Sequence, residues 1–178
     1  MNVGKLIDVA ILVIGTAMAM FHLVSTQYLF LGVYQFYNAH LAFSLVLVFL
    51  LLLKKTKKRG GRIGTLILLG LSLGVVAYMG IHSDDLMARM GYPEGLDFAF
   101  CILLLIVVVV ATRRSFGYIF PVLSAVFTAY AFWGYKLPSP LDAAYFPWDS
   151  MLSRLSLSSG IYGLGLSVSA NYIFLFIL

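Results

Sequence analysis

Charged side chains are scarce in this sequence. Only 11% of its 178 residues are Asp, Glu, Lys or Arg, whereas 62% are hydrophobic. A soluble domain has about 25% charged and about 45–50% apolar residues. The shortage of charge therefore excludes a soluble globular protein and indicates an integral membrane protein.

Groups of residues that carry out chemistry are missing as well. The chain has one cysteine, Cys101, so no internal disulfide can form. The sequence contains no Cys/His cluster, no glycine-rich phosphate loop and no nucleophile elbow. We therefore expect no enzymatic activity and no cofactor bound by this chain.

Positive charge is concentrated in residues 54–62 (KKTKKRGGR), which carry six basic residues and no acidic one between two long apolar runs. Moving such a run across a bilayer costs on the order of several kcal/mol, so we expect it to stay in the cytoplasm. There it would also attract anionic lipids, by about 1 kcal/mol for each basic residue near the surface. A nucleic-acid patch is the other common use of such a run, but the apolar flanks argue against it.

Eight basic residues are expected to determine the topology: Lys54, Lys55, Lys57, Lys58, Arg59, Arg62, Arg113 and Arg114. With Lys5 they place nine of the twelve basic residues on the cytoplasmic side, whereas Asp8 is the one acid of the seven on that side. This asymmetry predicts a cytoplasmic N-terminus and places residues 82–95 and 136–150 outside.

Six apolar stretches approach the roughly 20 residues that a membrane-spanning helix needs. They are residues 6–24, 34–53, 63–81, 96–112, 116–135 and 160–178. The small residues at 17–19 would also fit a signal-peptide cleavage site, but Asp8 interrupts the apolar run and favours an uncleaved helix.

A short amphipathic helix is predicted to begin near Asp149 or Ser150. Its apolar residues Met151, Leu152 and Leu155 share one face, with Ser153 and Arg154 opposite, a pattern typical of a helix lying in the membrane interface. The expected fold is therefore an all-α integral membrane protein with about six transmembrane helices and one short interfacial helix.

Three histidines offer alternative functions. His22 and His40 lie near the outer ends of neighbouring predicted helices, so they are candidate axial ligands for a haem in an electron carrier. The favoured interpretation is that each is an interfacial residue with a hydrogen-bond partner. His82 with Asp84 and Asp85 is a candidate metal site, although a solvated outer loop is favoured.

The last apolar stretch, residues 160–178, is unusually rich in small and polar residues. Ser167, Ser169 and Asn171 follow three glycines within it. Small residues weaken a helix and permit unwound backbone, which transporters use around a substrate. Tight helix packing explains the same pattern and is favoured on the residues alone.

Several motifs resemble one family of transporters. Residues 160–178 read GIYGLGLSVSANYIFLFIL, residues 40–43 read HLAF, and ATRR at 111–114 is followed by Gly117 and Pro121. In this order they are similar to segments of the fused TRAP transporter permeases, which join a small (Q) and a large (M) subunit and work with TAXI-type binding proteins. The likeness covers residues 38–58 and 90–178. Gly165, Ser167 and Asn171 stand where that family has proline, glycine and threonine.

The resemblance implies a permease component of a tripartite ATP-independent periplasmic secondary transporter in a bacterial or archaeal cytoplasmic membrane. Such a permease receives an organic acid from a periplasmic binding protein and is driven by an ion gradient, with Na⁺ as the usual coupling ion. Residues 1–114 would correspond to the Q-like scaffold, and residues 115–178 would begin the M-like transport region. Ser167, Ser169 and Asn171 are the candidates for the substrate or ion path.

The final residues, 174–178, are fully apolar, although an inward-running helix is expected to finish with polar or basic residues. We therefore expect the last helix to be truncated, the rest of the large subunit to be a partner, and this chain alone not to transport. The alternative function is a stand-alone small membrane scaffold or assembly protein without transport activity.

Overall fold

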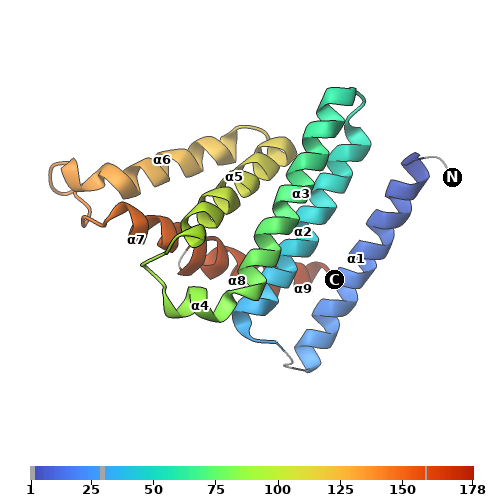
Figure 1. Ribbon diagram of the computed structural model, residues 1–178, viewed down its shortest axis with the longest axis horizontal. Helices are drawn as coiled ribbons and strands as arrows, with labels where there is room; N and C mark the ends of the chain where they lie inside the picture. The colour runs from blue at the N-terminus through green and yellow to red at the C-terminus, as the bar shows by residue number, and fades with distance from the viewer. Residues whose placement is uncertain (1–2, 29–30, 159) are drawn as a thin grey trace.

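The computed structural model describes residues 3–28, 31–158 and 160–178, and every regular element in these ranges is a helix (Figure 1). A search of the described residues finds five stretches that are long and apolar enough to cross a membrane: Gly4–Gln27, Val33–Lys55, Arg59–Ile81, Leu96–Phe116 and Trp148–Ile177, the last of which includes the undescribed position 159. The first lies within α1 (Val3–Gln27), and the next three are α2, α3 and α5. The expectation of an all-helical chain typical of a membrane protein is confirmed.

The core lies between α2, α3 and α5. Apolar residues spaced four apart occupy one side of α2, since Leu41, Leu45 and Phe49 are all buried. Met79 of α3 and Leu104 of α5 meet this stripe, and both are completely buried. The three helices α2, α3 and α5 therefore form the hydrophobic core of the bundle.

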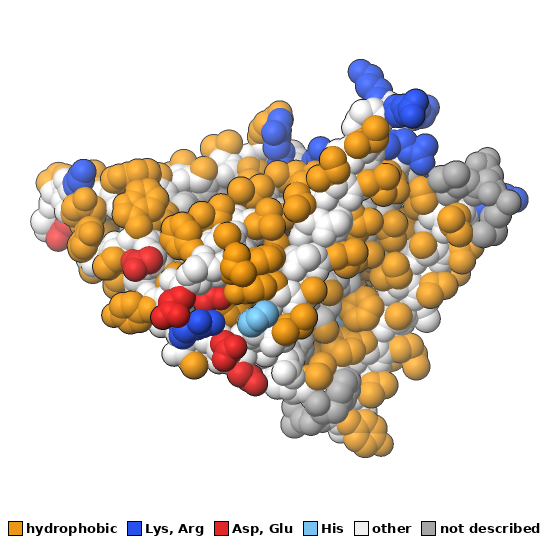
Figure 2. Space-filling model, in the orientation of Figure 1, with side chains coloured by type: hydrophobic (Ala, Val, Ile, Leu, Met, Phe, Trp, Pro, Cys, Tyr) orange, Lys and Arg blue, Asp and Glu red, His pale blue; other side chains and the backbone are white. Residues whose placement is uncertain are grey.

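Opposite charges lie at opposite ends of this bundle. Most of the Lys and Arg side chains visible in Figure 2 gather near the upper ends of α2 and α3, whereas Asp and Glu gather along the lower edge. At the basic end, the Lys54 Nζ atom lies 2.5 Å from the Asp8 Oδ1 atom, and Arg114 donates a hydrogen bond to Thr65 over 3.0 Å. The basic run and the Arg113–Arg114 pair therefore share one end of the bundle.

The connection between α2 and α3 is shorter than the sequence suggests. Helix α3 begins at Arg59, within the basic run, so only residues 56–58 lie between the two helices. Gly61 permits this tight turn, because a Cβ atom there would lie 2.7 Å from a methyl carbon of Thr56. On the acidic side, a short helix, α4 (Ser83–Ala88), occupies part of the predicted 82–95 loop.

Helix α6 (Ile119–Trp133) is shorter than the predicted fifth span. Helix α5 continues to Phe116, and Gly117, with a φ of +82°, ends it. The 15 residues of α6 rise about 22 Å, less than the roughly 30 Å of a hydrocarbon core. A 3-10 turn, η1 (Gly134–Lys136), follows. Within residues 119–133, all of which are described, no side chain is buried.

The predicted interfacial helix and the predicted last span form one apolar stretch, Trp148–Ile177, which we call the crossing segment. It comprises α7 (Trp148–Ser153), η2 (Arg154–Ser158), η3 (Ile161–Gly165), α8 (Leu166–Val168), η4 (Ser169–Ile173) and α9 (Phe174–Ile177). The prediction that Ser153 lies opposite the buried face is wrong. Ser153 is completely buried, and Met151 and Leu152 are buried as well, because α7 packs against α5 and the loop after α4.

The crossing segment passes across the bundle rather than along it. In Figure 1, α1, α2 and α3 lie side by side, and the last elements run from the far left toward α1. Its first part packs against α5 and its middle part against α2. Near its end, the Phe174 ring lies 4.3 Å from the His22 ring of α1, centroid to centroid. The segment therefore contacts three of the long helices in turn.

Candidate functional site

Two of the three predicted site residues lie at the point where the crossing segment passes α2. Ser169 and Asn171 both belong to η4. The Ser169 Oγ atom lies 3.1 Å from the His40 Nε2 atom, and the Asn171 amide donates a hydrogen bond of 3.1 Å to the Tyr37 hydroxyl. Ser167, on α8, is half-buried and lies outside this group.

His22 and His40 contact each other directly. The Nε2 atom of His22 lies 2.9 Å from the Nδ1 atom of His40, and the other ring nitrogen of His22 lies 2.8 Å from the Met18 carbonyl oxygen. The exposed fractions of the two side chains are 0% and 3%. Each ring has a hydrogen-bond partner, as the favoured sequence interpretation expects, and both side chains are buried within the bundle.

This arrangement does not suit axial ligation of a haem. Two axial histidines place their nitrogens on opposite faces of one iron, with the macrocycle between the rings. Here the facing nitrogens share a hydrogen bond of 2.9 Å, which leaves no space for a macrocycle between them. His82, in turn, stacks on Tyr78 at 4.5 Å between ring centroids. Among the described residues, no group of three or more His, Cys, Asp or Glu is placed to hold a metal ion.

A cavity lies on each side of the crossing segment. One, of about 370 Å³, lies toward the acidic end and includes Tyr37 and Asn171 in its lining. The other, of about 420 Å³, lies toward the basic end, between α2, α5 and the crossing segment. Its polar lining consists of His40, Ser44, Thr112, Ser115 and Ser169. An imidazole and four hydroxyl groups in an otherwise apolar wall can hold a small polar or anionic molecule.

Asn38 anchors the crossing segment to the bundle. Its amide donates to the Val76 carbonyl of α3 over 3.0 Å, and its side-chain oxygen accepts a hydrogen bond from the Tyr162 hydroxyl over 2.5 Å. Tyr162 also stacks on Tyr34 at 4.5 Å between centroids. Sequence reasoning missed this group, although an asparagine inside an apolar helix is a usable signal, because a buried amide needs partners.

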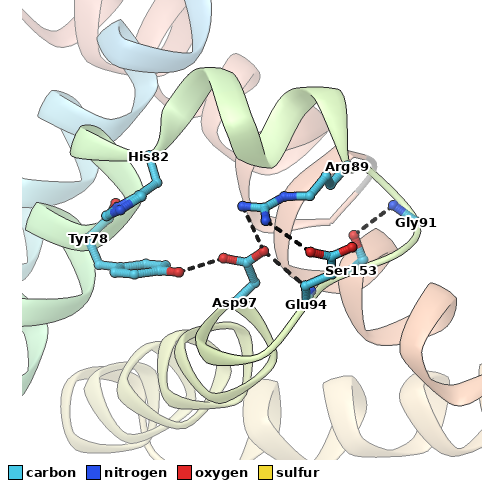
Figure 3. A network of polar contacts seen from close by, with 7 residues as sticks. All are labelled: Tyr78, His82, Arg89, Gly91, Glu94, Asp97 and Ser153. Atoms are coloured by element: carbon cyan, nitrogen blue, oxygen red, sulfur yellow. Dashed lines mark hydrogen bonds and ion pairs between the residues drawn. The ribbon is translucent and has the colours of Figure 1, made fainter.

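A second polar network lies at the acidic end, around the loop between α4 and α5 (Figure 3). Asp97, with only 2% of its surface exposed, accepts a hydrogen bond from the Tyr78 hydroxyl over 2.5 Å and lies 3.2 Å from the Arg89 guanidinium. Arg89 also pairs with Glu94 at 3.3 Å. The Gly91 N–H donates to Ser153, which ties the same loop to the crossing segment. These contacts satisfy a buried carboxylate and fix the loop between α4 and α5.

The geometry thus offers a hydrogen-bonded histidine pair, two cavities and an interrupted helical segment between them. Interrupted helices and buried ionisable side chains are features that membrane transport paths commonly contain. Comparison of the chain with protein-family models, curated proteins and solved structures finds no match.

Proposed function

We propose that this chain is a permease component of an ion-gradient-driven TRAP secondary transporter for organic acids, working with a periplasmic TAXI-type binding protein. Residues 1–114 would serve as the Q-like scaffold and residues 115–178 as the start of the M-like transport region. Sodium is the coupling ion that the resemblance implies, and Ser167, Ser169 and Asn171 are the proposed contributors to the path.

The observation that carries this proposal is the interrupted backbone of the crossing segment. Gly160 and Gly163 have non-helical ψ angles of −120° and −119°. Gly163 interrupts the π-helical element η3, and two further π-helical elements, η2 and η4, lie before and after it. Interrupted helices free backbone groups that bind substrates and ions in secondary transporters. Here the interruption lies beside the basic-end cavity, whose lining includes Ile161, Gly165 and Ser169 of this segment.

The proposed setting is a bacterial or archaeal cytoplasmic membrane. The basic end faces the cytoplasm and its anionic lipids, and the acidic end faces the binding protein. Helix α6 would be a sixth, tilted or incomplete span. Its apolar surface, which includes Ile119, Val126 and Phe127 at more than half exposure, is available to the remainder of the large subunit.

Uptake into right-side-out membrane vesicles tests the proposal. The vesicles are prepared from cells that express the chain with its genomic neighbours, and they receive the TAXI-type binding protein and labelled succinate or glutamate. We expect accumulation that needs both the binding protein and a sodium gradient. Ser169→Ala should reduce it several-fold, whereas Ser124→Ala, which removes a hydroxyl that lines neither cavity, should not.

Two outcomes would contradict the proposal. Accumulation that continues without this chain would instead support the stand-alone scaffold. Accumulation that needs neither the binding protein nor an ion gradient would exclude a TRAP-type transporter.

A further inference from the structure

The hydrogen-bonded chain from Met18 to Ser169 has one consistent arrangement of protons when both rings are neutral. A carbonyl oxygen only accepts, so the His22 Nδ1 atom carries a proton and donates it to the Met18 oxygen. The His22 Nε2 atom of a neutral ring must then accept, so the His40 Nδ1 atom carries the other proton. The His40 Nε2 atom accepts in turn, and the Ser169 hydroxyl donates to it.

This arrangement leaves one place where a further proton can bind without loss of a hydrogen bond. The hydroxyl of Ser169 can reverse, because a serine oxygen both donates and accepts. The His40 Nε2 atom then carries a proton and donates to Ser169, while its Nδ1 atom keeps its bond to His22. The hydroxyl proton of Ser169 becomes free to donate into the basic-end cavity, which both residues line.

We propose that His22 and His40 form a binding site for a single proton, which enters from the basic-end cavity through His40. The proton binds at the His40 Nε2 atom, and the charge is shared with His22 through the bond between the rings. His22 lines neither cavity, so His40 is the point of entry. This inference goes beyond the proposed transport function and does not depend on it.

The pair accepts one proton and not two. A second proton would have to bind at the His22 Nε2 atom, which would place two N–H groups against each other across 2.9 Å. Two positive charges at that distance also repel strongly in a medium of low dielectric constant. Binding of a second proton therefore requires the contact between the rings to break.

A positive charge on the pair would face aromatic rings rather than a counter-ion. The rings of Phe21, Phe36 and Phe174 lie 5.3, 5.3 and 4.3 Å from the His22 ring, within the range of a cation–π contact. In the described part of the chain, no acid, lysine or arginine makes a hydrogen bond or an ion pair with either histidine.

The titratable groups on the elements packed against the pair are few. On α1, α2, α5 and the crossing segment, the described ones besides the two histidines are Lys5, Asp8, Tyr34, Tyr37, Lys54, Lys55, Asp97, Cys101, Arg113, Arg114, Asp149, Arg154, Tyr162 and Tyr172. Lys5, Asp8 and the lysines of α2 lie at the basic ends of their helices. The two histidines are therefore the only imidazoles among these groups, so a change in imidazole signals reports on the pair itself.

Nitrogen NMR of the full chain in lipid nanodiscs tests the site. In a His82→Gln background with ¹⁵N-labelled histidine, only the pair contributes ring signals, and ¹⁵N shifts distinguish the two neutral tautomers from the charged ring. From about pH 9 to about pH 4, a range that brackets ordinary histidine titration, we expect uptake of one proton by the pair. At the alkaline end both rings should carry their proton on Nδ1. Two separate protonations, no uptake, or protons on Nε2 in the neutral state would each overturn the proposal.

Single substitutions test which ring binds the proton. In His22→Gln, His40 keeps its contact with Ser169 and should take up a proton. In His40→Gln, that binding atom is lost and His22 should remain neutral over the same range. The opposite pattern would exclude His40 as the ring that binds the proton. The titration of the unsubstituted pair remains decisive even if one of these variants fails to fold.

Discussion

The hydroxyl of Tyr162 donates a hydrogen bond of 2.5 Å to the side-chain oxygen of Asn38. The two residues lie 124 positions apart in the sequence, and both are buried. Because Asn38 also donates to the Val76 carbonyl, one asparagine joins α2, α3 and the crossing segment. The position of the crossing segment, and with it that of Ser169, depends on this junction.

Removal of the Tyr162 hydroxyl should therefore loosen the crossing segment. Tyr162→Phe leaves the Asn38 oxygen without its buried donor, which we expect to cost about 0.5–1.5 kcal/mol of unfolding free energy. Unfolding in mixed detergent micelles measures this loss. Tyr172→Phe is the matched control, because Tyr172 is 58% exposed. Equal losses in the two variants would mean that the hydrogen bond contributes nothing specific.

Gly80 should be intolerant of any side chain. A Cβ atom at Gly80 would lie 2.6 Å from the Asn38 side-chain nitrogen, so Gly80→Ala must displace the Asn38 amide. We expect a loss of about 1–3 kcal/mol, typical of overpacking. Gly74 lies on the same helix and is the control. Apart from the backbone of its own helix, no described atom lies within 4 Å of a Cβ atom placed there. Gly74→Ala should therefore be neutral or slightly stabilising. Thermal unfolding of both variants checks this, and comparable losses would contradict it.

Much of the helical fold is readable from the sequence. Long apolar runs and the positions of charge predict the extents of α2, α3 and α5 to within a few residues, because hydropathy and charge act locally. The length of α6 differs, since the break at Gly117 makes it begin later, and the turn after Trp133 makes it end earlier, than hydropathy alone indicates. The sequence pattern divides the crossing segment into two helices, because polar residues separate its apolar parts.

The candidate site was predictable only in part. Ser169 and Asn171 stand out as polar residues in an apolar stretch, and the structure places both at the passage across α2. Their partners could not be predicted, because hydropathy carries no information about which helices cross. The contact between His22 and His40 could not be predicted either, because it depends on how α1 packs against α2.

Asp97 should be essential for holding the loop between α4 and α5 in place at the acidic end. Asp97→Asn removes the charge that pairs with Arg89 and weakens the bond from Tyr78, which we expect to cost about 1–3 kcal/mol, because Arg89 remains partly exposed. Limited proteolysis of the loop between α4 and α5 should become faster. Asp85→Asn, on the exposed side of α4, is the control and should behave like the parent chain. Equal proteolysis rates in both variants would show that the network does not hold the loop.

The purified protein should show no haem absorption. The two histidine nitrogens that a haem would need are bonded to each other, so a visible spectrum should contain no Soret band. A stoichiometric haem signal that disappears in both His22→Ala and His40→Ala would require a rearranged pair and would contradict this expectation.

The orientation of the bundle can be determined with single cysteines. Cys101 is completely buried, so Cys101→Ala provides a background without an accessible thiol. Met87→Cys lies exposed on α4 at the acidic end, Ser139→Cys lies exposed in the predicted outer loop 136–150, and Ser115→Cys lies exposed at the basic end. In intact cells, an impermeant maleimide should label the first two and not the third. Permeabilised cells should show labelling of all three.

The basic run should be the cause of this orientation. Each Lys or Arg moved through the bilayer centre costs about 2.5–3.5 kcal/mol, so replacement of Lys57, Lys58, Arg59 and Arg62 by Gln removes most of the bias toward the cytoplasm. The neutralised chain should insert in both orientations, and its Ser115→Cys form should become partly labelled in intact cells. Replacement of Asp84 and Asp85 by Asn is the matched control and should change nothing, because acids contribute little to orientation. If the neutralised chain is labelled like the parent, another segment sets the topology. If the parent itself is labelled at Ser115→Cys and not at Met87→Cys, the basic end faces outward and the proposed direction of transport is reversed.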